Sequence, residues 1–303
     1  MSFKLTILGS NSATPAYGRH HTSQLLTINN QRFLIDCGEG TQERLAKFKN
    51  HPYQIDHIFI SHLHGDHYLG LMGLIFTMHL MRRTKDLFIF GQRGLKEIIT
   101  TQLRYSDSTL NYNIVFRELD ASKSELLYED KSVEVHSFPL QHRIPCSGFR
   151  FKEKPKPPRI NKETLPKNIS LLNIAALKRG EDINHDDRQY KNAELTLPPK
   201  KAFSYAFCSD TLYTETIIPY IEKVDLLYHE STFLDEKKKW ADLTFHSTTK
   251  QAATIAQKAD VSRLIIGHFS ARYKDLTPFL TEAQEVFSAT SLAYEGDEIK
   301  LRD

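Results

Sequence analysis

Residues 61–67 read Ser-His-Leu-His-Gly-Asp-His, so three imidazoles and one carboxylate share one short stretch of chain. The stretch follows an apolar run at 57–60 that is typical of a short buried strand. Imidazole nitrogen and carboxylate oxygen are the ligands that zinc and similar borderline cations prefer. Because a purely structural loop has no need of so many such groups, the pattern predicts a metal site at a strand end. The chemistry that such a site favours is metal-assisted hydrolysis.

The elements around this loop predict an α/β fold. Short β-branched and aromatic runs alternate with helix-like patterns along most of the 303-residue chain. The expected strands are 4–8, 24–28, 32–35, 58–60, 87–90, 114–118, 125–128, 133–138, 202–208, 226–229, 263–266 and 298–301. The expected helices are 40–49, 66–83, 92–103, 248–259 and 276–286. Since no linker other than one insertion divides the chain, we expect a single domain over 1–303, with two sheets and helices outside them.

The alternating pattern fails between about residues 152 and 201, where six prolines lie among charged residues. Between Lys152 and Lys167 there are six basic residues and two acidic ones. We expect an inserted basic arm, whose positive charge favours contact with a polyanion. Its candidate contact residues are Lys154, Lys156 and Arg159. The alternative interpretation is a solvated, disordered loop, which is what such a composition usually forms.

Cysteine usage and hydropathy bear on the compartment. The three cysteines are scattered and form no C-x-x-C pair, so the sequence indicates neither a disulfide framework nor a Cys-type zinc site. The longest apolar stretch, 69–81, is interrupted by His79 and is too short to span a bilayer. The first ten residues lack the pattern of a signal peptide. We therefore expect a protein of the reducing cytoplasm with no membrane partner.

Further candidate ligands follow other apolar runs. His142, Asp210 and His268 each stand just after such a run, where a strand end can deliver a side chain to a rigid rim. A single histidine at a strand end is more often an ordinary polar residue, but the 61–67 loop changes that interpretation. The seven candidate ligands are His62, His64, Asp66, His67, His142, Asp210 and His268. They suffice for two metals, with an oxygen ligand such as Asp210 as one bridge and a nucleophilic hydroxide as the other.

The loop resembles the H-x-H-x-D-H motif of the metallo-β-lactamase superfamily, which stands here at residues 62–67. The resemblance implies an αββα sandwich, here with an inserted basic arm, and a site at one edge of two packed sheets. It also implies two zinc ions per subunit. The first would be held by His62, His64 and His142, the second by Asp66, His67 and His268, and Asp210 would lie between them.

Further stretches are similar to the short form of the ribonuclease Z family, the tRNA 3′-processing endonucleases. They are residues 9–22, 34–44, 58–73, 229–232, 246–248 and 267–273, and together they span most of the chain. The resemblance implies a zinc-dependent endoribonuclease that removes the 3′ trailer from precursor tRNA, leaving a 3′-hydroxyl on the tRNA and a 5′-phosphate on the trailer. It further implies a homodimer in which the arm of one subunit serves the site of the other. The usual Gly-Pro-rich segment of that arm is not recognisable here.

Phosphodiester cleavage assigns work to residues outside the ligand set, because the departing ribose oxygen must take a proton. His246 is the candidate acid, and by the resemblance Glu230 orients its imidazole and raises its proton affinity. The resemblance also makes Asp66 a proton acceptor. Arg272 is expected to clamp a phosphate oxygen, and Tyr273 to offer a ring near the substrate end. The alternative for His246 is a structural place beside a helix cap.

Two other classes of function use the same features. A small-molecule hydrolase or phosphodiesterase of this fold would use the same metals in a compact pocket, but the long basic arm argues against it. A metal-free binding module derived from such an enzyme would have lost ligands, and none is missing here. Cleavage of a small phosphodiester but not of precursor tRNA would favour the small-molecule hydrolase.

Overall fold

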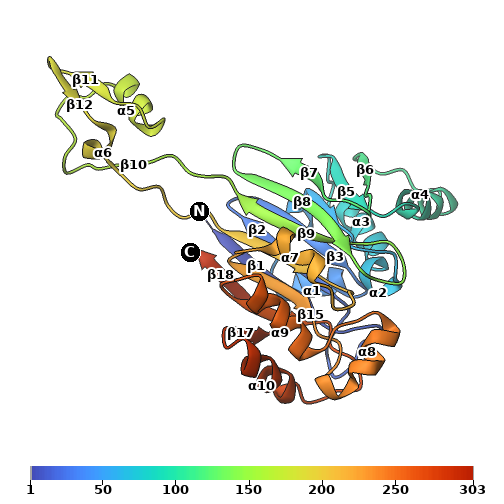
Figure 1. The fold of residues 1–303 in the computed structure, drawn as a ribbon. Coiled ribbons are helices and arrows are strands. Elements are labelled where there is room, and N and C mark those ends of the chain that lie inside the picture. The colour runs from blue at the N-terminus through green and yellow to red at the C-terminus, as the bar shows by residue number, and fades with distance from the viewer. Residues whose placement is uncertain (1, 303) are drawn as a thin grey trace.

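Two seven-stranded sheets pack face to face in the computed structural model, which describes residues 2–302 (Figure 1). The first sheet has the spatial order β18 (Glu298–Arg302), β1 (Phe3–Gly9), β2 (Ser23–Ile28), β3 (Gln31–Cys37), β4 (His57–Phe59), β5 (Leu87–Gly91) and β6 (Ile114–Glu118). The second has the order β17 (Thr290–Leu292), β16 (Leu264–Gly267), β15 (Leu226–Glu230), β14 (Ser204–Cys208), β9 (Cys146–Glu153), β8 (Val133–Leu140) and β7 (Glu125–Glu129).

Apolar side chains fill the space between the sheets and the space under the helices on both sides. Between the sheets the core is rich in aromatic rings, and those of Phe59 and Phe90 stack with centroids 4.6 Å apart. The helices over the first sheet are α1 (Thr41–Lys47), α3 (Leu71–Leu80) and α4 (Leu95–Tyr105). Those over the second are α7 (Ile218–Ile221), α9 (Thr249–Lys258) and α10 (Thr277–Val286). The expected αββα sandwich is confirmed.

The carboxyl ends of several strands meet at one edge of the sandwich. Strands β3 and β4 are parallel in the first sheet, and β14, β15 and β16 are parallel in the second. The Ser61 carbonyl after β4 accepts a hydrogen bond from the Ser147 amide of β9 at 3.1 Å, which ties the sheets together there. Ligands in α/β folds bind at such edges, and every predicted metal ligand except His142 follows a parallel strand.

The helix expected over 66–83 is two helices, α2 (Gly65–Tyr68) and α3, with a break at Gly70. A Cβ at Gly70 would lie 2.2 Å from the carbonyl oxygen of Gly38, so the chain passes closer to β3 than any side chain would allow. The break places Asp66 and His67 on a short turn of their own. That turn lies directly at the sheet edge.

Residues 154–203 lie between β9 and β14 and extend away from both sheets (Figure 1). They form β10 (Arg159–Ile160), α5 (Leu171–Lys178), β11 (Ile183–His185), β12 (Arg188–Tyr190), α6 (Asn192–Leu195) and β13 (Thr196–Leu197). Leu177, Ile183 and Leu195 make a small apolar core separate from the main ones. Lys152 of β9 pairs with Ser204 of β14, so the two ends of this segment lie side by side. The inserted segment has regular structure, which its proline-rich sequence did not predict.

The described residues also bear on membrane contact and redox state. Within 2–302, no helix combines the length and apolar composition needed to cross a bilayer. Cys37, Cys146 and Cys208 are all buried free thiols. Burial raises the pKa of the Cys37 thiol to about 12, which makes it an unreactive core residue.

Candidate metal centre

Asp36 at the end of β3 holds the 61–67 loop in place. Its buried carboxylate accepts the Ser61 amide at 2.7 Å and the Ser61 hydroxyl at 2.9 Å. The same carboxylate lies 2.7 Å from Nδ1 of His67. With Nδ1 occupied in this way, His67 directs Nε2 toward the other candidate ligands. The sequence alone indicates no role for Asp36, because only its place near the end of an apolar strand distinguishes it.

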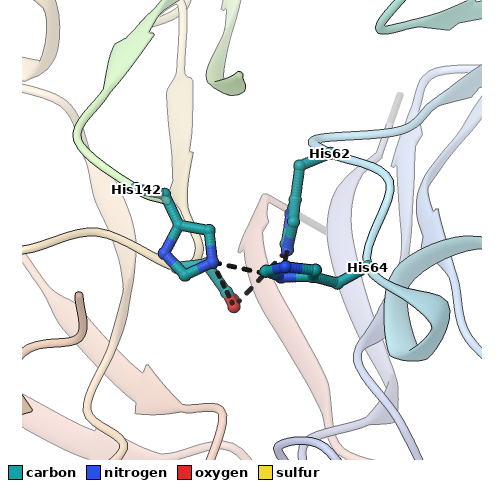
Figure 2. Close-up of side chains that lie close together, drawn as sticks. His62, His64 and His142 are labelled. Atoms are coloured by element: carbon teal, nitrogen blue, oxygen red, sulfur yellow. Dashed lines mark hydrogen bonds and ion pairs between the residues drawn. The ribbon is translucent and has the colours of Figure 1, made fainter. Parts of the chain in front are cut away.

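The first group of candidate ligands is His62, His64, His142 and Asp210, whose ligand atoms all lie within 4.8 Å of one another (Figure 2). Nε2 of His62 and Nε2 of His142 lie 3.0 and 3.1 Å from Nδ1 of His64. The same two Nε2 atoms lie 3.5 and 3.7 Å from Oδ2 of Asp210. Figure 2 shows the three rings converging on one point, those of His62 and His64 from one loop and that of His142 from another segment of chain.

The second group is Asp66, His67 and His268. Oδ2 of Asp66 lies 3.5 Å from Nε2 of His67 and 3.7 Å from Nε2 of His268. Oδ1 of Asp210 lies 3.3 and 3.1 Å from the same two nitrogens. Asp210 therefore faces the first group with one carboxylate oxygen and the second group with the other. The structure thus brings all seven predicted ligands together and places Asp210 between the two groups.

These residues fit a pair of divalent cations. Nε2 of His67 and Nε2 of His268 are buried and have no hydrogen-bond partner within residues 2–302. In His142 and His268 the other ring nitrogen, Nδ1, has a hydrogen-bond partner. Nδ1 of His142 donates to the Phe245 carbonyl at 2.9 Å, and Nδ1 of His268 lies 2.9 Å from the Thr232 hydroxyl. Such outer hydrogen bonds are typical of metal-ligating histidines. An orphaned nitrogen beside two carboxylates is what a bound cation would satisfy.

The charge balance among these side chains leads to the same conclusion. Burial lowers the pKa of His67, but the carboxylates of Asp210, Asp66 and Asp36 more than offset this and raise it well above its usual value. Burial and the charge of His67 lower the pKa of His62, which stays neutral. Neutral imidazole is the form that binds metal. The carboxylates of this site therefore attract positive charge.

Two of the candidate ligands, Asp210 and His268, and the residue that anchors the loop, Asp36, have left-handed backbone conformations. The φ angles are 54° at Asp36, 42° at Asp210 and 61° at His268. Asp and His are among the residues that adopt this region more readily than most, although it still costs free energy relative to the ordinary regions. Such conformations gather at functional sites, where the surrounding structure holds them in place.

A buried carboxylate beside the metal groups organises a second set of residues. Oε1 of Glu230, at the end of β15, accepts the amides of Thr211 and Ser247, both at 3.1 Å, and lies 2.9 Å from Nδ1 of His246. Oε2 accepts the Thr232 amide at 3.0 Å and its hydroxyl at 2.7 Å. Burial lowers the pKa of His246, but Glu230 more than offsets this and raises it to about 9.

The helix cap expected beside His246 is present, but the His246 ring takes no part in it. Thr248 caps α9, and its hydroxyl and the Gln251 side chain form a reciprocal capping box. The His246 ring instead points to Glu230. Thr232 links this pair to the metal groups, because its hydroxyl donates to Glu230 and accepts a hydrogen bond from His268. Sequence reasoning gave Thr232 no role, since a contact across 36 residues leaves no local pattern.

A cavity of about 390 Å³ opens beside the first group, and His64 and His142 of that group line it. Its lining includes His64, His142 and His246, with Arg143 and Arg272. A larger hollow of about 810 Å³ lies beside α1 and α3, but its lining contains none of the grouped ligands. The chemistry therefore belongs to the smaller cavity. The predicted Arg272 lines it, with the guanidinium carbon 6.0 Å from the centre of the Phe233 ring.

The other residues predicted to contact the substrate do not line the cavity. The Tyr273 ring packs against Phe279 with centroids 4.8 Å apart, its hydroxyl is buried, and it does not line the cavity. Lys154 pairs with Glu129. Lys156 pairs with Glu153 at 3.0 Å, and Arg159 donates to the Pro198 carbonyl at 3.0 Å. These three basic residues therefore lie at the root and stem of the inserted segment, where they hold neighbouring chain.

Known proteins share this fold and parts of this sequence. The sequence profile of the family described as "Anti-Pycsar protein Apyc1" matches residues 3–150, just under half of the chain. Among solved structures, human tRNase Z, short form (ELAC1), superposes with a TM-score of 0.73 at 26% identity, covering 99% of this chain and 100% of that one. The metallo-β-lactamase fold protein YhfI from Bacillus subtilis gives 0.70 at 18% identity, which shows the fold alone; 99% of this chain and 100% of YhfI are covered.

Curated relatives match over nearly the whole chain. The protein named Ribonuclease Z from Cytophaga hutchinsonii is 49% identical over 305 residues, with 100% of this chain and 97% of that protein covered. Ribonuclease Z from Bacteroides fragilis is 43% identical, with 97% of each chain covered. Since identity at this level extends along the full length, the chain belongs to the ribonuclease Z family.

Proposed function

We propose that the protein is a zinc-dependent endoribonuclease that removes the 3′ trailer from precursor tRNA, leaving a tRNA 3′-hydroxyl and a trailer 5′-phosphate. Family membership carries the reaction class. The structural observation that supports the mechanism most directly is the position of Asp210. One of its carboxylate oxygens faces the first ligand group, and the other faces the second. Three free, buried thiols are consistent with action in the reducing cytoplasm.

The ligand groups would hold one zinc ion each, with Asp210 shared between them. Bound there, the two ions would supply an activated water as nucleophile and neutralise charge on the phosphodiester. Asp66 is the proposed proton acceptor. Burial raises its pKa, but the neighbouring His67 more than offsets this, so the pKa lies well below its usual value and the carboxylate is ionised, which is the form that binds a cation. Its Oδ2 also accepts the Ala13 amide at 2.9 Å, which fixes its orientation.

His246 is the proposed proton donor to the departing ribose oxygen. Nδ1 of its ring faces Glu230, and the ring lines the cavity, so Nε2 is the nitrogen left for the substrate. The Glu230 carboxylate favours the protonated form of the His246 ring. Five hydrogen bonds fix the orientation of that carboxylate. Arg272, at the rim of the same cavity, is the proposed phosphate contact.

The inserted segment is the proposed tRNA-binding arm, and a homodimer is the proposed assembly. Strand β9 begins at Cys146 near the metal groups and ends at Glu153, where the arm starts. Eight residues of strand span roughly 25 Å, so the arm emerges from the edge of the sandwich opposite its own site. This direction favours an arm that serves the site of a second subunit. RNA binding would draw on lysines such as Lys162 and Lys167 for phosphate contacts.

The first test of the proposal is the reaction itself. Purified protein loaded with zinc should cut a precursor tRNA once, and end mapping should find a 3′-hydroxyl on the tRNA and a 5′-phosphate on the trailer. Chelation should abolish the cut, and added zinc should restore it. Hydrolysis of bis(p-nitrophenyl) phosphate without any cleavage of precursor tRNA would instead favour the small-molecule phosphodiesterase.

Replacing the arm by a short turn should separate binding from chemistry. Because Lys152 and Ser204 are paired neighbours, residues 155–201 can be exchanged for a tight hairpin turn without moving β9 or β14. Losing several phosphate contacts should raise the KM for precursor tRNA by about tenfold or more at 0.15 M salt, and hydrolysis of bis(p-nitrophenyl) phosphate should be preserved. An equal loss on both substrates would contradict the proposed role of the arm.

A further inference from the structure

Trp240 is the one tryptophan of the chain, and its ring lies on the molecular surface beside the cavity. It belongs to α8 (Lys238–Thr244), whose last residue, Thr244, lines the cavity. The Trp240 side chain is 45% exposed. A large ring held half in water at the mouth of a catalytic cavity is well placed to contact a substrate.

Arg272 joins this ring to the cavity. Its guanidinium carbon lies 5.3 Å from the centre of the Trp240 ring and 6.0 Å from that of Phe233, and both Arg272 and Phe233 line the cavity. Within residues 2–302, no hydrogen bond or ion pair engages the guanidinium. The two rings therefore hold the guanidinium in place, and its N–H groups remain available to a ligand.

The charge around the platform favours an anion. Along α8 and the turn before it, Asp235, Glu236 and Asp242 balance Lys237, Lys238 and Lys239. The excess positive charge at the cavity mouth thus comes from Arg272 and Arg143, which both line it. Proteins that bind single-stranded nucleic acids combine aromatic rings with positively charged side chains. The rings stack on the bases, and the positive charges attract the phosphate that every nucleotide carries.

We propose that Trp240 and Arg272 form a stacking platform for an unpaired nucleobase next to the bond that is cut. The inference rests on the proposed function, since it presumes an RNA substrate in the cavity. Beyond the paired stem, the nucleotides at the 3′ end of a precursor tRNA are single-stranded, and their bases are free to stack on protein rings. Stacking of this kind tolerates any base, so the platform would position the strand without reading its sequence.

Alanine at position 240 tests the platform. Trp240→Ala should lower kcat/KM for precursor tRNA roughly 5- to 150-fold, the range that corresponds to the loss of one stacked base. Trp240→Phe keeps an aromatic face and should recover most of that loss. Leu243→Ala removes another exposed apolar side chain of α8, which is 68% exposed, and should match the parent protein. Cleavage by Trp240→Ala at the parent rate would overturn the proposal.

An abasic substrate makes the test specific to the base. With a precursor tRNA that lacks the bases on either side of the cut, the parent protein and Trp240→Ala should have equal kcat/KM. A persistent difference would show that Trp240 acts through the fold rather than through stacking. If Trp240→Ala instead converts a dimer to a monomer in sedimentation, the ring belongs to a subunit contact and the proposal is wrong. Absence of any precursor cleavage by the parent protein would reject the proposed function itself.

Single-tryptophan emission gives a readout without turnover. Because Trp240 is the only tryptophan, fluorescence quenching on addition of precursor tRNA reports on this ring alone. The zinc-loaded His246→Ala variant should show saturable quenching with normal precursor tRNA and much less with the abasic one. Binding of the normal precursor without any change in emission would contradict the proposed contact.

Discussion

Replacing His246 by alanine should slow cleavage of precursor tRNA by about 10²- to 10⁴-fold, the contribution usual for a positioned proton donor. The ribose oxygen is a poor leaving group, and without a proton it must depart as an alkoxide. A ligand atom of His246 also lies within 4.8 Å of those of Asp210 and His268, but its Nδ1 is occupied by Glu230, and we assign the imidazole to the acid pair. Single-turnover cleavage, with zinc counted on the same sample, measures both consequences.

The matched control is a substrate that needs no acid. The p-nitrophenolate group of bis(p-nitrophenyl) phosphate leaves readily without a proton, so the His246→Ala variant should hydrolyse it at nearly the parent rate. The zinc content should stay at two ions per subunit. If the cleavage rates of the variant fall equally on both substrates, or if its zinc content falls, then His246 serves as a ligand or a structural residue. Its assignment as the acid would then be wrong.

Replacing Asp210 by asparagine should cause a larger loss, at least about 10³-fold on both substrates, because the charge stabilisation that bound metal supplies is worth several kcal/mol. Each carboxylate oxygen of Asp210 faces a different ligand group, and an amide keeps only one oxygen and no charge. Zinc content should therefore fall below two ions per subunit. Elemental analysis after dialysis measures this directly.

The backbone at this position makes asparagine the informative substitution. Asp210 has a φ of 42°, in a region that asparagine also tolerates, so the fold should survive the exchange. Asp187→Asn is the matched control, since Asp187 has a φ of 56° on the exposed arm, away from the ligand groups. Full zinc occupancy in Asp210→Asn would show that this carboxylate does not bridge the two ions.

The sequence predicted the site better than it predicted the surrounding chain. The sequence anticipated that residues such as His62 and His268 would lie at one edge of the sheets, because each follows an apolar strand and strand ends can be recognised from local composition. Asp36 and Thr232 were not assigned, because they act through hydrogen bonds to residues far away in the sequence. Trp240 was missed for the same reason, since only the folded chain brings it to Arg272.

Several elements of secondary structure also escaped prediction, among them α8, β17, β9 and the elements of the arm. Strand β9 was not among the expected strands, although the alternation of apolar and charged residues in Phe149, Arg150, Phe151 and Lys152 is typical of a half-buried strand. The arm was expected to lack regular structure, but three side chains far apart in sequence supply its small core. Local composition carries no record of such pairings.

The left-handed backbone at Asp36, Asp210 and His268 has a consequence for engineering. Glycine adopts such angles freely, so glycine at Asp210 or His268 should relieve local strain of about 1 kcal/mol while deleting a ligand. At Asp36 the same change would also leave the buried Ser61 amide without its partner. A campaign that ranks variants by melting temperature alone would then favour proteins that fold more robustly and no longer hold metal. Selection for heat resistance in this scaffold therefore has to be paired with a count of bound ions.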